Sequence, residues 1–181
     1  VRMLRVLRFA AKLDFTIEAA TAAAIPGCAE LLGEIPAARL FDEFLKLFLS
    51  GYAAATLELL LQHHLLQYLF PASSEHIHKD QHALALVRAA MANTDQRIAE
   101  DKPVTPAFIL AALLWPAAQH QSLHLQNRGD PPMVAMHSAA QTTIAEASRH
   151  ISIPRRFSQP MREIWEFQLR LQRRQGRRAA E

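Results

Sequence analysis

A nearly unbroken helical pattern is the feature that most constrains this sequence. Ala and Leu dominate it, Gly occurs at only 5 of 181 positions, and no run alternates apolar and polar residues as a half-buried strand would. Prolines divide the pattern where helices usually begin, at Pro36 and in the Thr105-Pro106 pair, which reads as a cap followed by a first turn. The sequence therefore predicts an all-α fold.

The same signals predict the limits of the helices. We expect helices over residues 1–13, 36–50, 53–62, 74–100, 130–150 and 158–174. Thr16 is expected to cap a further short helix that ends before Pro26. The helix that opens at Thr105 is expected to kink or end at Pro116, with a polar loop over residues 119–132.

Charge is distributed unevenly along the chain. The net charge is +3, but residues 149–181 hold nine arginines, no lysine and three glutamates, so the rest of the chain is slightly acidic. An arginine-rich end favours an anionic partner, because guanidinium groups bind phosphate bidentately and stack on bases. Residues 151–160, with Pro154 and Pro160 around Arg155 and Arg156, are predicted to join this end to the body.

Some classes of protein are disfavoured. The single cysteine, Cys28, cannot form an internal disulfide, and the sequence shows neither a signal peptide nor an apolar run long enough for a membrane span, so we expect a cytoplasmic location. Val1 opens in mid-helix, which suggests a piece of a larger protein. The sequence contains no D-x-D pair, no glycine-rich phosphate loop and no nucleophile elbow, so we expect the chain alone to be catalytically inactive.

Nine histidines raise the possibility of a metal site. His76, His78 and His82 could converge at a helix start, and His120 and His124 lie one turn apart. No cysteine or carboxylate falls into a recognised ligand spacing with them, so we predict no metal site.

The first helix is predicted to carry a cationic ladder. At about 100° per residue, Arg2, Arg5, Arg8 and Lys12 fall within an arc of about 120°. The remainder of the helix is expected to be covered by its apolar residues, which are Met3, Leu4, Val6, Leu7 and Phe9. The ladder is either a solvated face of a core helix or a surface that faces nucleotide phosphates and base edges.

The order of residues 1–13 resembles the ED-x-x-R-M-L-R-x-x-R-F-A helix of the class II nucleotidyltransferases, the bacterial poly(A) polymerases and CCA-adding enzymes. The resemblance implies that Arg2, with Arg5 beside it, contacts the base of the incoming nucleotide, and that Arg8 and Lys12 contact RNA. The paired acids of the motif would precede Val1. Asp14 stands where relatives usually have Gly.

Further segments extend the resemblance to the whole chain. Residues 35–46 are similar to the family's neck segment, in which Arg39, Glu43 and Lys46 share one helix face and brace the neck; from spacing alone they would be a surface row of ion pairs. Residues 93–98, 106–108, 153–156 and 162–179 favour poly(A) polymerases over CCA-adding enzymes. The implied divisions are neck helices over 1–70, a helical body over 71–150 and a basic helix over 151–181.

The last predicted helix is amphipathic. Its apolar side is expected to hold Met161, Ile164, Trp165, Phe167, Leu169 and Leu171. We expect Arg155 and Arg156, together with the opposite face, to follow an RNA backbone, and that face carries Arg162, Arg170, Arg173, Arg174 and Arg177, extended by Arg178. An acidic protein or a membrane surface would be the alternative partner.

The function implied by the resemblance is addition of AMP from ATP to RNA 3′ ends. ATP and Mg²⁺ would be held by a head domain that precedes this segment, with RNA 3′ ends as the partner. Two alternatives stay open: a CCA-adding enzyme, and a non-catalytic helical adaptor that binds acidic proteins.

Overall fold

The computed structural model describes residues 1–178, and the side chains as far as Gln172. Within this part of the chain every regular element is a helix, which confirms the all-α prediction. In chain order the elements are α1 (Arg2–Leu13), α2 (Ala19–Ala29), the 3₁₀ turn η1 (Glu30–Glu34), α3 (Ala37–Phe48), α4 (Ala53–Gln62), α5 (Leu66–Leu69), α6 (Pro71–Ile77), α7 (Gln81–Ala99), α8 (Pro106–Asn127), α9 (Pro132–Ile151), the 3₁₀ turn η2 (Arg155–Phe157) and α10 (Ser158–Arg178).

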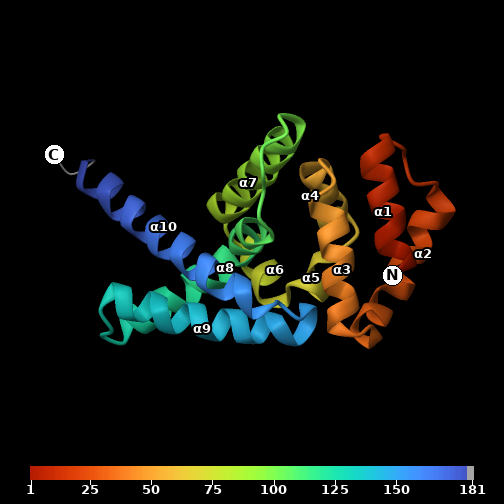
Figure 1. The fold of residues 1–181 in the computed structure, drawn as a ribbon. Coiled ribbons are helices and arrows are strands. Elements are labelled where there is room, and N and C mark those ends of the chain that lie inside the picture. Colours follow the sequence, from red (N-terminus) through yellow and green to blue (C-terminus); the bar gives the residue numbers. More distant parts are fainter. Residues whose placement is uncertain (179–181) are drawn as a thin grey trace.

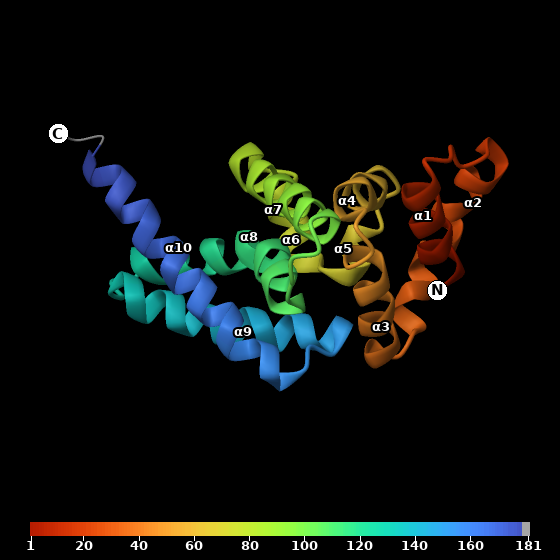
Figure 2. The ribbon, with the colours of Figure 1, turned by 45° about the horizontal axis from the view of Figure 1, so that its top comes forward.

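The helices form an elongated molecule whose two ends are far apart (Figures 1 and 2). Helices α1 and α2 lie at one end beside α3 and α4, and α5 to α8 occupy the middle. Helix α9 packs along α8, and α10 crosses this pair before its C-terminal part projects away from the body. The described helices include none that is both long and apolar enough to cross a membrane.

One apolar core runs through the molecule, from Leu4 of α1 to Trp165 of α10. Its centre is aromatic: the ring of Phe44 lies 5.3 Å from that of Phe48 and 5.9 Å from that of Phe70, between centroids. Such pairs add to the stability that burial alone gives. Helix α3 therefore connects the N-terminal end of the molecule to its middle.

Two prolines, Pro26 and Pro116, lie inside helices, so the predicted end before Pro26 and the predicted loop over 119–132 are wrong. Helix α2 continues past Pro26 to Ala29, and the side chain of Glu18, not Thr16, accepts the capping hydrogen bond, from the N–H of Thr21 at 3.2 Å. Helix α8 continues past Pro116 to Asn127, so most of the predicted loop over 119–132 is helical. A proline inside a helix costs about 3 kcal/mol, but Pro116 and its neighbours are buried, and their packing offsets this cost.

The single helix predicted over 74–100 is two helices. Helix α6 ends at Ile77, and α7 begins after Asp80, whose carboxylate accepts hydrogen bonds from the N–H groups of His82 and Ala83. An aspartate at this position satisfies N–H groups that would otherwise have no partner at a helix start. The break turns α7 away from α6 and toward α4.

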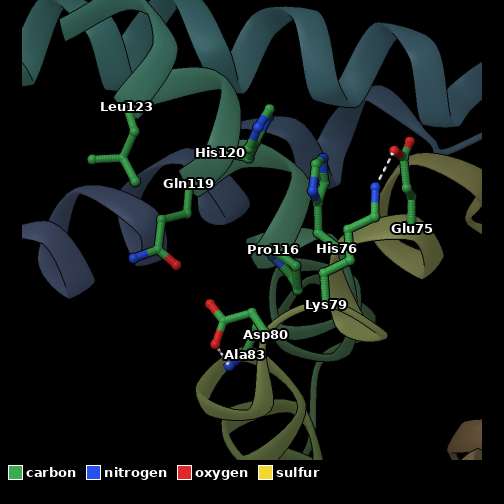
Figure 3. Close-up of a pocket in the computed structure, with 9 residues that line it drawn as sticks. All are labelled: Glu75, His76, Lys79, Asp80, Ala83, Pro116, Gln119, His120 and Leu123. Atoms are coloured by element: carbon green, nitrogen blue, oxygen red, sulfur yellow. Dashed lines mark hydrogen bonds and ion pairs between the residues drawn. The ribbon is translucent and has the colours of Figure 1, made fainter. Parts of the chain in front are cut away.

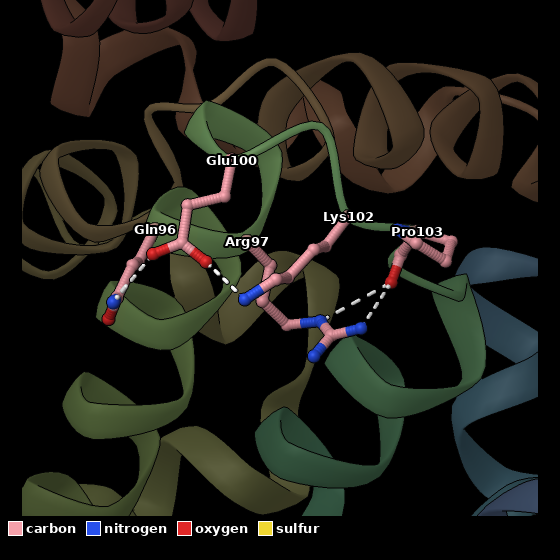
Figure 4. A network of polar contacts seen from close by, with 5 residues as sticks. All are labelled: Gln96, Arg97, Glu100, Lys102 and Pro103. Carbon is pink, nitrogen blue, oxygen red and sulfur yellow. Dashed lines mark hydrogen bonds and ion pairs between the residues drawn. The ribbon is translucent and has the colours of Figure 1, made fainter.

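Helix α7 and the loop that follows it hold α4 and α8 in place. Both carboxylate oxygens of Asp95 accept hydrogen bonds at the start of α4, from the N–H groups of Ala53 at 2.6 Å and Ala54 at 2.9 Å. The guanidinium of Arg97 donates to the carbonyl oxygen of Pro103 at 3.0 and 3.3 Å, and Glu100 pairs with Lys102 (Figure 4). Residues 93–98 thus connect α7 to the start of α4 and to the loop before α8.

Candidate nucleic-acid interface

Helix α1 presents cations on the face opposite the core. It packs on α3 and α4 through three buried side chains, Leu4, Leu7 and Ala10. On the other face Arg2, Arg5 and Lys12 are exposed and Arg8 is half-buried. The cationic ladder predicted from the helical spacing is therefore present as a surface feature.

Phe9 belongs to this cationic face, which corrects the sequence analysis. We had assigned it to the apolar remainder of α1, but its side chain is 50% exposed. At 100° per residue Phe9 lies only about 20° from Arg2 around the helix, so its placement follows from spacing that we overlooked. The guanidinium carbon of Arg8 lies 5.1 Å from the centre of its ring, within the range of a cation–π contact.

Glu43 connects the ladder to α3. Its side chain is only 4% exposed, and one carboxylate oxygen lies 3.1 Å from the Lys46 ammonium and 3.7 Å from the Arg5 guanidinium. Within the described residues Glu43 thus pairs with Lys46 and Arg5, while Arg39 is exposed one turn earlier on α3. A carboxylate buried between two half-exposed cations fixes the distance between α1 and α3.

A groove of about 350 Å³ lies between α1 and α3. Arg8, Phe9 and Lys12 line it from α1. Leu45, Lys46, Leu49 and Ser50 line it from the end of α3. Three cations, one aromatic ring and an apolar floor are the groups that bind single-stranded nucleic acid without reading its sequence.

The apolar side of helix α10 is only partly buried. Met161 and Trp165 are buried, whereas Phe167 is 60% exposed and Leu171 is 55% exposed, so only part of the predicted apolar side is covered by the body. Phe167 lies at one edge of the apolar arc and Leu171 lies within it. The projecting half of α10 stands apart from the other described helices.

The arginines of this region lie in three different settings. Arg162 is half-buried and donates to the carbonyl oxygen of Ser158 at 3.2 Å, and Arg170 is exposed, 5.7 Å from the ring centre of Phe167. Arg155 and Arg156 are exposed on η2. The side chains of four further predicted residues, Arg173, Arg174, Arg177 and Arg178, lie outside the described part of the structure.

A second hollow, of about 470 Å³, lies between α6, the start of α7 and α8 (Figure 3). In it the imidazole rings of His76 and His120 are stacked with their centres 4.0 Å apart. Burial, and then the neighbouring His120, lower the pKa of the His76 imidazole below its ordinary value. The Lys79 ammonium donates to Glu75 at 2.8 Å beside them.

Neither region offers a set of metal ligands. Among the side chains that the structure describes, no three His, Cys, Asp or Glu residues come close enough to hold a metal ion. The resemblance assigns Mg²⁺ to the head domain that would precede this segment, and not to these side chains.

Comparison with known proteins decides the family. Residues 14–77 match a family model described as "Probable RNA and SrmB- binding site of polymerase A", and residues 128–181 match one described as "Polymerase A arginine-rich C-terminus". The chain is 42% identical over 99% of its length to Poly(A) polymerase I of Escherichia coli O6:H1, and 37% identical over 97% of its length to that of Haemophilus influenzae. The chain belongs to the bacterial poly(A) polymerase family.

The poly(A) polymerase relatives are longer than this chain. It spans 39% of the Escherichia coli protein and 40% of the Haemophilus protein. Similarity to CCA-adding enzymes is partial: the protein of Leuconostoc mesenteroides is 44% identical over 69 residues, which is 38% of this chain. The first poly(A) polymerase model covers α3 and its side of the groove, and the second covers α9 and α10.

Proposed function

We propose that this chain is the RNA-holding, base-contacting portion of a polynucleotide adenylyltransferase, an enzyme that adds AMP from ATP to RNA 3′ ends. The observation that carries the proposal is the α1–α3 groove, with three cations and an exposed aromatic ring, in a chain 42% identical to a Poly(A) polymerase I. Phosphate contacts of this kind supply affinity without selecting a sequence, as suits a growing 3′ tail.

Arg2 and Arg5 are the proposed contacts to the base of ATP. Arg2 is exposed in the first turn of α1, and its guanidinium can donate two hydrogen bonds to base acceptors. Arg5 lies one turn further along and is oriented by Glu43, 3.7 Å away. The chemistry of nucleotidyl transfer, with ATP and Mg²⁺, is assigned to parts of the protein beyond these residues, so this chain alone is expected to be inactive.

The proposal includes a division of labour along the chain. Residues 1–70 would form the neck, with Arg39, Glu43 and Lys46 bracing it, residues 71–150 the body, and residues 151–181 a second RNA-holding surface. Arg155, Arg156 and the arginines of α10 would contact phosphates there. We place the enzyme in the cytoplasm, where its RNA substrates are.

A CCA-adding enzyme is the nearest alternative, and it is favoured only by the similarity over 69 residues. An adaptor for acidic proteins would use the same arginines, but its binding would not depend on RNA length. The full-length protein, supplied with an RNA primer, ATP, CTP and Mg²⁺, separates the three functions. Repeated addition of AMP supports the proposal. Addition of CCA alone supports the CCA-adding alternative instead. If no nucleotide is transferred, both enzyme assignments are contradicted.

The role of Arg2 has its own test in the same assay. Arg2→Ala leaves base acceptors unpaired, so we expect the preference for ATP over CTP to fall by about 1–3 kcal/mol. Arg128→Ala, an exposed arginine after α8, is the matched control and should leave the preference unchanged. An unaltered preference in the Arg2 variant would exclude Arg2 from base recognition.

A further inference from the structure

We propose that the α1–α3 groove holds one nucleotide of a single-stranded RNA, with its base stacked on Phe9 and its phosphates contacted by Lys12 and Lys46. This inference rests on the proposed RNA-holding function and assigns it a defined subsite. It gives Phe9 a binding role and gives Lys46 a second role besides its pairing with Glu43.

Phe9 has the exposure and surroundings of a stacking platform. Half of its surface is open to solvent, whereas Leu4 and Leu7 of the same helix are fully buried. The Arg8 guanidinium lies 5.1 Å from the ring centre, and both groups stack on bases. An aromatic ring set among cations is suited to a ligand that has both a flat apolar face and a negative charge.

The cations of the groove exceed the acidic groups near it. No Asp or Glu is among the described residues that line it, and Glu43, which pairs with Lys46 and Arg5, is buried. Lys12 is exposed and stands one turn beyond Arg8 on the same face of α1. The groove therefore offers phosphate contacts on both α1 and α3.

The shape of the groove favours one unpaired nucleotide. Its volume of about 350 Å³ is near the lower limit of the roughly 300–1,000 Å³ typical of small-molecule sites. Leu45 and Leu49 give it an apolar floor. A duplex buries the faces of its bases in its own stack, so only a single strand can present a base to Phe9.

Binding of two fluorescent probes to the 181-residue chain tests the subsite. One probe is oligo(A), and the other has the same length and backbone but lacks bases. Phe9→Leu should weaken oligo(A) binding about tenfold, the effect of losing one stacked base, and should leave the abasic probe unaffected. Phe15→Leu, which changes a phenylalanine that is 66% exposed just after α1, is the matched control and should affect neither probe. Lys12→Gln combined with Lys46→Gln should weaken the binding of both probes.

The outcomes separate this inference from the proposed function. If the unchanged chain does not bind oligo(A), both are overturned. If it binds, but Phe9→Leu behaves like the unchanged chain or weakens both probes equally, only the stacking subsite is overturned. Should circular dichroism show that Phe9→Leu unfolds the chain, photo-crosslinking of a 5-bromouridine oligomer to the unchanged chain decides. A crosslink at Phe9 supports the subsite, and crosslinks only elsewhere overturn it.

Discussion

The indole N–H of Trp165 donates a hydrogen bond to the backbone carbonyl oxygen of Ala111, 2.9 Å away, across 54 residues of sequence. This bond joins α10 to the N-terminal part of α8, where both partners are buried. It sets the point at which α10 leaves the body.

Trp165→Phe should lower the free energy of unfolding by about 1–3 kcal/mol, because it removes the donor and leaves a cavity beside α8. Denaturant titration measures this loss. Phe167→Leu changes an exposed ring on the same helix and should alter the free energy of unfolding by no more than about 0.5 kcal/mol. Equal stability of the two variants would contradict the anchoring role of Trp165.

Asp14 ends α1 in the left-handed conformation, with φ of 52° and ψ of 41°. Such a conformation favours Gly, which has no Cβ to clash in the left-handed region. Asp14→Gly should therefore raise the free energy of unfolding by up to about 1 kcal/mol. Asp42→Gly, within α3, should lower it by a few tenths of a kcal/mol. A destabilised Asp14→Gly variant would show that the aspartate side chain stabilises the helix end.

The sequence predicted the helical class and most helix boundaries because caps and prolines act locally. Helix α4 lies exactly where periodicity placed it, over residues 53–62. Helices α2 and α8 continue past Pro26 and Pro116, because tertiary packing can offset the local penalty of a proline inside a helix. Asp80 is a capping residue type, so the sequence contains a signal for the break between α6 and α7.

The candidate site was predictable only in part. Helical spacing found the cationic face of α1, and the same spacing, applied to Phe9, would have added its aromatic ring. The groove itself was not predictable, because it depends on how α1 packs against the end of α3 near Lys46. No local signal indicated that Asp95 would cap α4 from a distant helix, or that His76 and His120 would stack.

His76 makes stability depend on pH. Its pKa is lowered in the folded chain by burial and by His120, so the unfolded chain binds the proton more readily. Its contribution is fully present above its ordinary pKa of 6.5 and is lost as the pH falls through the lowered value. We therefore expect His76→Gln to lose less stability than the unchanged chain between about pH 7.5 and 5.5, which is about one unit either side of the ordinary pKa. Thermal unfolding at a series of pH values measures this difference. Glu75, Lys79 and Asp80 also face this site and could make stability depend on pH. If the His76→Gln variant and the unchanged chain lose stability in parallel as the pH falls, the assignment to His76 is contradicted.

Glu43→Gln should change stability and RNA binding in opposite directions. The free energy of unfolding should fall by about 1–3 kcal/mol, because Arg5 and Lys46 lose their shared counter-charge. Oligo(A) affinity should rise about two- to threefold, because a negative charge near the groove is gone. Glu34→Gln, an exposed change in η1, is the control for both measurements. Weaker RNA binding by the Glu43 variant at full helix content would contradict a phosphate-binding role for Lys46.

The central claim is that the cationic surfaces of this chain hold RNA through its phosphates. Two sets of substitutions to Gln divide these surfaces: Arg8, Lys12 and Lys46 at the groove, and Arg170, Arg173, Arg174 and Arg177 on α10. Gln keeps helix propensity and removes the charge, so circular dichroism should barely change.

The most direct measurement is the salt dependence of oligo(A) and oligo(U) binding by the unchanged chain and by these two variants. We predict that the logarithm of the affinity falls linearly with the logarithm of the salt concentration, with a slope near −0.7 per neutralised phosphate. The groove variant should reduce that slope by about two units and the α10 variant by about three, equally for both oligomers. RNA binding that does not depend on salt, or unchanged affinity and slope in both variants, would contradict the claim.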